Sequence, residues 1–157
     1  MIDNHCHLEQ EDYDKNRDEI ISKCKGELKA LITCCADSRD WKITKEISKK
    51  HKGFVFVTAG EHPQYIEDIM KGEKGEISEY IEELRKAAKE GLLVGIGEVG
   101  LDFHWIKDPV SRDKQKDMFI KFINLAKEVN LPLVVHSRDA YLEWLALVPY
   151  NFPLALI

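Results

Sequence analysis

Hydrophobic and polar positions along the chain follow two patterns in turn, which predict strands and helices alternately. Short apolar runs, typical of strands buried on both faces, lie at residues 2–7, 28–35, 54–59, 92–97, 131–136 and 152–157. Longer segments with helical spacing separate most of them, at residues 13–25, 38–50, 77–89, 111–129 and 139–148. In one of these, Ile77, Ile81, Leu84 and Ala88 share a helix face, and Gly91 follows as a stop signal. This alternation predicts a parallel sheet covered by helices, which is an α/β fold.

Composition indicates one globular domain. The 157 residues are 44% hydrophobic and 32% charged, proportions typical of a chain that buries a single core. No low-complexity linker interrupts the alternation of strand and helix. We therefore expect a single domain over residues 1–157.

Charge and cysteine content limit the partners and the compartment. A formal net charge of −5 disfavours a general nucleic-acid or membrane surface, so metal ions and a few basic side chains would hold a phosphate substrate locally. We expect no signal segment, no membrane span and no membrane partner. The chain has four cysteines and no CxxC pair, namely Cys6, Cys24, Cys34 and Cys35. This favours a reducing compartment over a disulfide framework. A dithiol or metal-binding role for the cysteines is the alternative. We expect a cytoplasmic protein.

Two histidines in the first predicted strand are the first candidates for chemistry. Side chains two positions apart on a strand point to the same face, so His5 and His7 should project side by side. Neighbouring imidazoles suit zinc, and they also serve manganese, nickel and iron. The alternative is two accidental surface histidines near the start of the chain.

Further polar residues follow the later strands. His62 comes after the third predicted strand, Glu98 closes the fourth, and His136 closes the fifth. The carboxyl ends of parallel strands form the mouth of a β/α barrel, where such folds place their chemistry. We therefore expect a metal site at the mouth of a partial TIM (β/α)8-type barrel that contains strands 1 to about 6.

Each of these candidates has a less specific explanation. Glu98 lies among glycines and apolar residues, and a buried carboxylate needs a partner. That partner is either Arg138, in a structural ion pair, or two metal ions that share the carboxylate. His136 is either a ligand or a hydrogen-bonded core histidine. His62 belongs either to a simple turn or to the site, as a ligand or as a residue that orients one.

Arg138 and Asp102 complete the candidate set. Arg138 either clamps a substrate phosphate with two hydrogen bonds or only orients Glu98. Asp102 either positions a metal ligand through a hydrogen bond or caps the start of the next helix. His51, which ends a lysine-rich helix, and His104, in an aromatic loop, are weaker candidates.

Four motifs together resemble the TatD family of metal-dependent deoxyribonucleases. They occur in family order, at residues 3–8 (DNHCHL), 60–63 (GEHP), 97–103 (GEVGLDF) and 131–140 (LPLVVHSRDA). The first motif alone also fits many amidohydrolase-type enzymes, and the last two narrow the resemblance. The resemblance implies a TIM barrel, two divalent metal ions (zinc, manganese, magnesium or nickel) and hydrolysis of phosphodiester bonds in DNA.

The resemblance also implies a role for each residue. It makes His5 and His7 ligands of one metal, His136 a ligand of the other, and Glu98 a bridge between them. Metal-activated water would attack the phosphorus, while the second metal and Arg138 stabilise the charge on the departing oxygen.

The chain departs from the family in its length. A TIM barrel usually needs about 250 residues, and this chain stops inside its sixth predicted strand. The family supplies a further histidine and an aspartate from strand 6 and a later strand, so each metal would lack one protein ligand. We therefore expect weakened metal binding and low or absent nuclease activity. A premature stop, a frameshift, a split gene or a sequence that holds only half of the protein would each give such a chain.

An incomplete barrel would expose strand edges. Residues 154–157 form an apolar edge, the first strand lacks its other neighbour, and such edges pair with other chains. We expect an obligate oligomer, a complex with a second polypeptide that supplies the remaining strands, or a poorly behaved monomer.

The favoured function is thus a metal-dependent deoxyribonuclease. Two alternatives remain. One is hydrolysis of another ester or an amide on the same barrel, because a fold does not settle its substrate. The other is a non-catalytic fragment whose metal residues persist without turnover.

Overall fold

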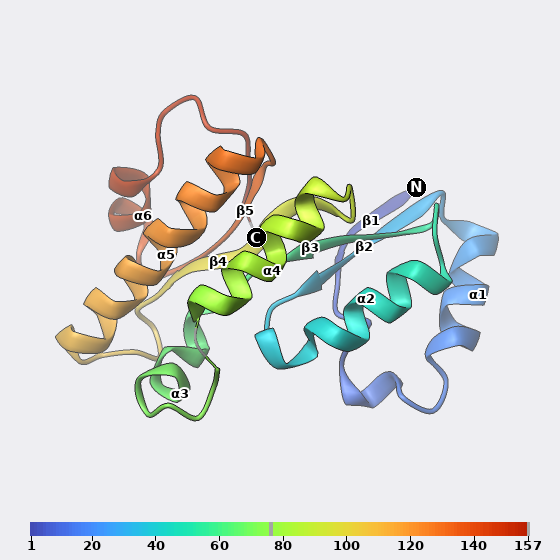
Figure 1. Ribbon diagram of the computed structural model, residues 1–157, viewed down its shortest axis with the longest axis horizontal. Coiled ribbons are helices and arrows are strands. Elements are labelled where there is room, and N and C mark those ends of the chain that lie inside the picture. Colours follow the sequence, from blue (N-terminus) through green and yellow to red (C-terminus); the bar gives the residue numbers. More distant parts are fainter. Residues whose placement is uncertain (76, 157) are drawn as a thin grey trace.

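Six parallel strands form one curved sheet in the order β1-β2-β3-β4-β5-β6 (Figure 1). The computed structural model describes residues 1–75 and 77–156. The strands are β1 (Ile2–Cys6), β2 (Ala30–Cys35), β3 (Val55–Ala59), β4 (Leu93–Asp102), β5 (Leu133–Arg138) and β6 (Leu154–Leu156). Each strand pairs in parallel with the next one along the chain, as in one side of a β/α barrel. The predicted partial barrel is therefore confirmed.

Helices connect the strands and cover the sheet. They are α1 (Arg17–Glu27), α2 (Trp41–Lys50), α3 (Ile66–Met70), α4 (Ile77–Lys89), α5 (Pro109–Val129) and α6 (Tyr141–Leu147). Figure 1 shows α2, α4 and α5 lying across one face of the sheet. Among the described residues, no helix is long and apolar enough to cross a membrane.

Apolar burial holds these helices on the strands. The main core contains fully buried side chains from α4, α5 and the central strands, among them Leu84, Ile96, Phe119 and Phe122. A smaller cluster around Ile21 lies between α1, α2 and the first strands. Each fully buried side chain of this size contributes about 1.5–3 kcal/mol. The core thus holds the carboxyl ends of the strands in place.

Strand β4 is longer than its apolar pattern predicts. The prediction that Glu98 closes the strand is wrong, because β4 continues to Asp102 and Glu98 lies in its middle. Gly97 and Gly100 have φ angles of 142° and 149°, which side-chain-bearing residues rarely adopt. The pairing with β5 is irregular there and then resumes, with Gly100 opposite His136. Glycines carry no apolar side chain, so the pattern hid the second half of this strand.

The start of α1 also differs from the prediction. The helix begins at Arg17 rather than at residue 13, and Gly26 lies inside it instead of ending it. Residues Glu11–Tyr13 form a separate 3-10 turn. The Arg17 guanidinium donates to the carbonyl oxygens of Leu8, Glu9 and Gln10. These hydrogen bonds hold the preceding loop in a turn that a helical pattern does not reveal.

Smaller boundary differences affect three further predictions. Strand β1 ends at Cys6, so His7 lies just past the strand. Strand β5 continues beyond His136 to Arg138. Helix α3 lies in a segment for which we predicted no element. The predicted sixth strand includes Ile157, which lies outside the described residues.

Candidate metal centre

A polar cavity of about 370 Å³ lies at the carboxyl edge of the sheet. Its walls come from strands β1, β4 and β5 and from the loops after β1, β2 and β3. The structure brings five of the predicted site residues into this cavity: His5, His7, His62, Glu98 and His136. Asp102 and Arg138 lie outside its lining.

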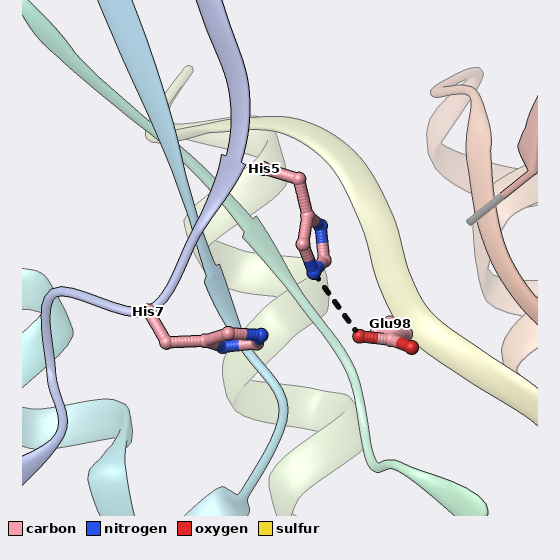
Figure 2. Close-up of side chains that lie close together, drawn as sticks. All are labelled: His5, His7 and Glu98. Carbon is pink, nitrogen blue, oxygen red and sulfur yellow. Dashed lines mark ion pairs between the residues drawn. The ribbon is translucent and has the colours of Figure 1, made fainter.

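Glu98 is the centre of the cluster. Its Oε2 lies 3.5 Å from His5 Nε2, and its Oε1 lies 2.8 Å from His136 Nδ1 and 3.4 Å from His62 Nε2. The two oxygens of one carboxylate thus face different histidines. Figure 2 shows His5 and His7 from the end of β1 turned toward Glu98 on β4.

The surroundings of Glu98 keep it ionised. Burial alone would raise the pKa of this carboxyl, whose side chain is only 8% exposed. Hydrogen bonds and charge from His136 and His62 outweigh burial and hold the pKa far below its usual range. Within residues 1–75 and 77–156, Glu98 forms ion pairs with histidines and none with Arg138. The histidines therefore take the place of the structural ion pair considered above.

His7 has one ring nitrogen committed to the protein. Its Nδ1 lies 2.8 Å from the carbonyl oxygen of Cys34 and 3.1 Å from Glu9 Oε1. Both partners only accept, so Nδ1 carries the proton and the Nε2 lone pair is free for a metal. The hydrogen bond to Glu9, opposed by burial, raises the pKa of His7. The rings of His5 and His7 meet edge to face with centroids 4.8 Å apart.

Glu9 is a residue that the sequence analysis missed. It is 4% exposed, and its second oxygen accepts a hydrogen bond of 2.8 Å from Thr33 Oγ1 on β2. Thr33 in turn accepts from the backbone N–H of Leu8. This network ties the loop after β1 to the neighbouring strand. A carboxylate two positions after a candidate ligand is the signal that would have identified it.

His136 lies between two carboxylates. Its Nδ1 faces Glu98, and its Nε2 lies 3.2 Å from Asp102 Oδ2. Burial by itself would lower the pKa of His136. Glu98 and Asp102 together raise it by more, so the net shift of the pKa is upward. The other oxygen of Asp102 accepts from the backbone N–H groups of His104 and Trp105. Asp102 thus combines a hydrogen bond to a candidate ligand with a cap on the following loop.

His62 presents the opposite tautomer to His7. The backbone N–H of Gln64 donates to His62 Nδ1 over 3.1 Å, so a neutral ring carries its proton on Nε2. That Nε2 faces Glu98 Oε1. A metal ion at Nε2 would require the proton to move to Nδ1, which would remove the hydrogen bond from Gln64. The geometry therefore favours donation to Glu98 over metal ligation.

A buried ion cluster supports the loop that carries His62. The Lys74 side chain is 0% exposed and donates to Asp37, at 2.7 Å, and to Glu61. Burial alone would raise the pKa of Asp37, but hydrogen bonds from Arg39 and Lys74 hold it below its usual range. Asp37 follows β2 and Glu61 follows β3, so Lys74 links both loops. The sequence analysis did not anticipate this cluster, because its members are far apart in the chain.

Arg138 is not among the residues that line the cavity. Its guanidinium carbon lies 5.4 Å from the ring centroid of Trp105, and the residue is exposed. His51 pairs with Asp18 and His104 pairs with Asp139, so neither joins the cluster. The four cysteines are free.

The donors fit divalent metal ions. Two overlapping groups place one potential ligand atom from each residue within 4.8 Å of the others, namely His5, His7 and Glu98, and His62, Glu98 and His136. Imidazole nitrogens with an ionised carboxylate suit zinc, manganese, nickel or iron. Donors of this kind at the carboxyl edge of a barrel sheet define the class of metal-dependent hydrolases.

Comparisons with known proteins identify the family within this class. The model of the family described as "TatD related DNase" matches residues 2–151. The chain belongs to this family of metal-dependent hydrolases, as its motifs predict.

Individual relatives agree with this assignment. The chain is 38% identical over 141 residues to YabD of Bacillus subtilis, described as an uncharacterized metal-dependent hydrolase, covering 89% of this chain and 51% of YabD. It is 30% identical over 148 residues to the Homo sapiens deoxyribonuclease TATDN3, covering 89% of this chain and 53% of that protein. The chain thus spans about half the length of the curated relatives it matches.

A solved structure from the same family has a similar fold. The crystal structure of a TatD family hydrolase from Entamoeba histolytica superposes with a TM-score of 0.75 at 21% identity, covering 94% of this chain and 52% of that one. At this identity the likeness concerns the fold alone.

Proposed function

We propose that the residues of this chain form part of a two-metal site that hydrolyses phosphodiester bonds in DNA. The observation that carries the proposal is Glu98, whose two oxygens face two different sets of histidines. A carboxylate in this position can bridge two metal ions and satisfy both its charge and its lone pairs. Family membership supports the hydrolase chemistry, and the deoxyribonuclease TATDN3 supports DNA as the substrate.

The chain's own side chains divide the work of holding the ions. His5 and His7 are the proposed ligands on one side of Glu98, and His136 is the proposed ligand on the other. Divalent ions at such a site act as Lewis acids on a phosphoryl oxygen and lower the pKa of water.

Three further residues orient these ligands. Glu9 holds His7 in the tautomer that leaves Nε2 free, and Asp102 faces Nε2 of His136 and so turns its Nδ1 toward Glu98. His62 donates to Oε1 of Glu98 and fixes the plane of its carboxylate. Arg138, outside the cavity lining, contacts substrate rather than the ions.

Metal binding and hydrolysis test the proposal together. Titration calorimetry with manganese and zinc should show binding to the wild-type chain that Glu98→Ala abolishes. Any cleavage of single- or double-stranded DNA should disappear in the same variant. Glu79→Ala, which removes an exposed carboxylate of α4, is the matched control and should change neither.

Two results would contradict the proposal. One is robust DNA cleavage that is insensitive to Glu98→Ala. The other is metal-dependent hydrolysis of lactones or amides without cleavage of DNA, which would retain the metal site and reject the substrate.

A further inference from the structure

The loop after β4 presents an exposed aromatic ring beside the candidate metal centre. Trp105 is 66% exposed, whereas Trp41 and Trp144 are 3% and 2% exposed. Exposing a tryptophan forgoes the large gain from burying it. An exposed ring on the loop that Asp102 ties to the candidate ligand His136 is therefore a candidate contact for a ligand.

Neighbouring groups hold this ring in place. Asp102 Oδ1 accepts from the backbone N–H of Trp105 at 3.1 Å, while its Oδ2 faces His136 Nε2. The Arg138 guanidinium carbon lies 5.4 Å from the ring centroid, and the His104 ring is perpendicular to the indole with centroids 4.7 Å apart. One carboxylate thus connects the loop that carries Trp105 to the proposed metal ligands. Trp105 is 66% exposed despite these two contacts, so most of the residue remains accessible to a ligand.

Three basic side chains lie on or near the same loop. The Lys107 ammonium donates to the carbonyl oxygen of Phe103, and the Arg112 guanidinium donates to those of Phe103 and Ile106. Within the described part of the chain, Lys107, Arg112 and Arg138 form no ion pair. These cations therefore retain charge for an anionic ligand, on a chain whose net charge is −5.

We propose that Trp105 and Arg138 form a subsite for single-stranded DNA, in which a base stacks on the indole and a phosphate pairs with the guanidinium. The inference rests on the proposed nuclease function and names the form of its substrate. An open aromatic face takes an unpaired base and is sequence-tolerant, because every base has a π-face. Bases inside a duplex are already stacked, so a double strand gains nothing from this ring.

Tryptophan fluorescence reads this subsite directly, since Trp105 is the exposed tryptophan. The 157-residue chain is titrated with a deoxythymidine octamer in EDTA, which prevents metal-dependent cleavage. We expect quenching of the long-wavelength emission. Trp105→Ala should abolish it and weaken binding of a labelled octamer, followed by anisotropy, at least about fivefold. Trp105→Phe keeps a stacking ring and should restore most of the affinity.

Arg138→Gln tests the phosphate contact. Loss of one contact should reduce the slope of log affinity against log salt by about 0.7 for a single strand. Tyr150→Ala is the matched control, because Tyr150 is 101% exposed and precedes β6 at the opposite edge of the sheet. It should change neither quenching nor affinity.

The outcomes separate this proposal from the proposed function. Absence of quenching, unchanged affinity in Trp105→Ala, or equal affinity for a duplex of the same length would overturn the subsite. If the subsite is overturned, metal-dependent hydrolysis of bis(p-nitrophenyl) phosphate that Glu98→Ala abolishes would still support the proposed phosphodiester hydrolysis. Quenching by the octamer without any binding of manganese or zinc in titration calorimetry would retain the subsite and reject the proposed metal site.

Discussion

At the scale of single residues, the second nitrogen of each histidine decides what the first can do. His7 donates from Nδ1 to Glu9 and to a carbonyl oxygen, which leaves Nε2 free. His62 accepts at Nδ1 from a backbone N–H, which puts a proton on Nε2. The sequence presents both as histidines after strands. Their tautomers, and hence their proposed roles, follow only from groups that the fold brings beside them.

Glu9→Gln should weaken metal binding about 10- to 100-fold, as is typical when a hydrogen-bond partner of a ligand is altered. The amide is almost the same size, but it is a weaker acceptor and leaves the basicity of His7 lower. Titration calorimetry with manganese measures the change. Glu11→Gln, an exposed neighbour on the same loop, is the control and should bind as the wild type does. Equal affinity in both variants would show that Glu9 serves the fold alone.

At the scale of elements, β4 carries the largest departure from the hydrophobic pattern. Its four residues 97–100 continue the strand with two glycines at φ angles near 145°. A Cβ on Gly100 would collide with the carbonyl oxygen of His136 on β5. Glu98 is thus positioned beside the histidines by backbone that only glycine accommodates. The sequence motif contains these glycines, but it does not show that the backbone of β5 leaves no room for a Cβ at these positions.

A strained backbone conformation by itself costs about 1–3 kcal/mol. Gly100→Ala should lower the free energy of unfolding by more than this. The collision with β5 adds to this cost, since that strand is packed in the core. Urea denaturation followed by circular dichroism gives the value.

Gly26→Ala is the matched control for this variant. Gly26 lies inside α1 with open space around its Cα, so alanine should stabilise the chain by about 0.5–1 kcal/mol. A Gly100→Ala variant as stable as the wild type would contradict the account of β4.

At the scale of the whole molecule, the sheet has two outer strands, β1 and β6. Apolar side chains on them are exposed, with Ile2 at 57% and Leu154 at 39%. Unpaired backbone groups beside exposed apolar side chains favour pairing with another chain. The expectation that this chain self-associates or takes up a second polypeptide therefore stays a prediction with a structural basis. The side chains of residues 155–157, part of the predicted apolar edge, lie outside the described ones.

The purified chain should have a mass in light scattering that is a multiple of its 18.1 kDa. Ile2→Lys places a charge on the outer strand and should shift the mass toward the monomer. Leu142→Lys, at a side chain 77% exposed on α6, is the control and should not. A clean, monodisperse wild-type monomer would count against association through these edges.

The sequence by itself determined the order of strands and helices, the parallel sheet and the family. Apolar periodicity reports which face of each segment is buried, and this is a local property. The sequence also predicted that His5, His7, Glu98 and His136 lie together, and they line one cavity, although Glu98 lies in the middle of β4 rather than at its end.

Only the tertiary structure decided how these groups meet. The hydrogen bond from His7 to the carbonyl oxygen of Cys34, the ion cluster around Lys74 and the stacking of Arg138 on Trp105 join residues whose relative positions depend on strand register and loop conformation. Local patterns carry no information on such distances. The edge where chemistry lies can therefore be read from the chain, whereas the tautomer of each histidine and the direction of each side chain require the fold.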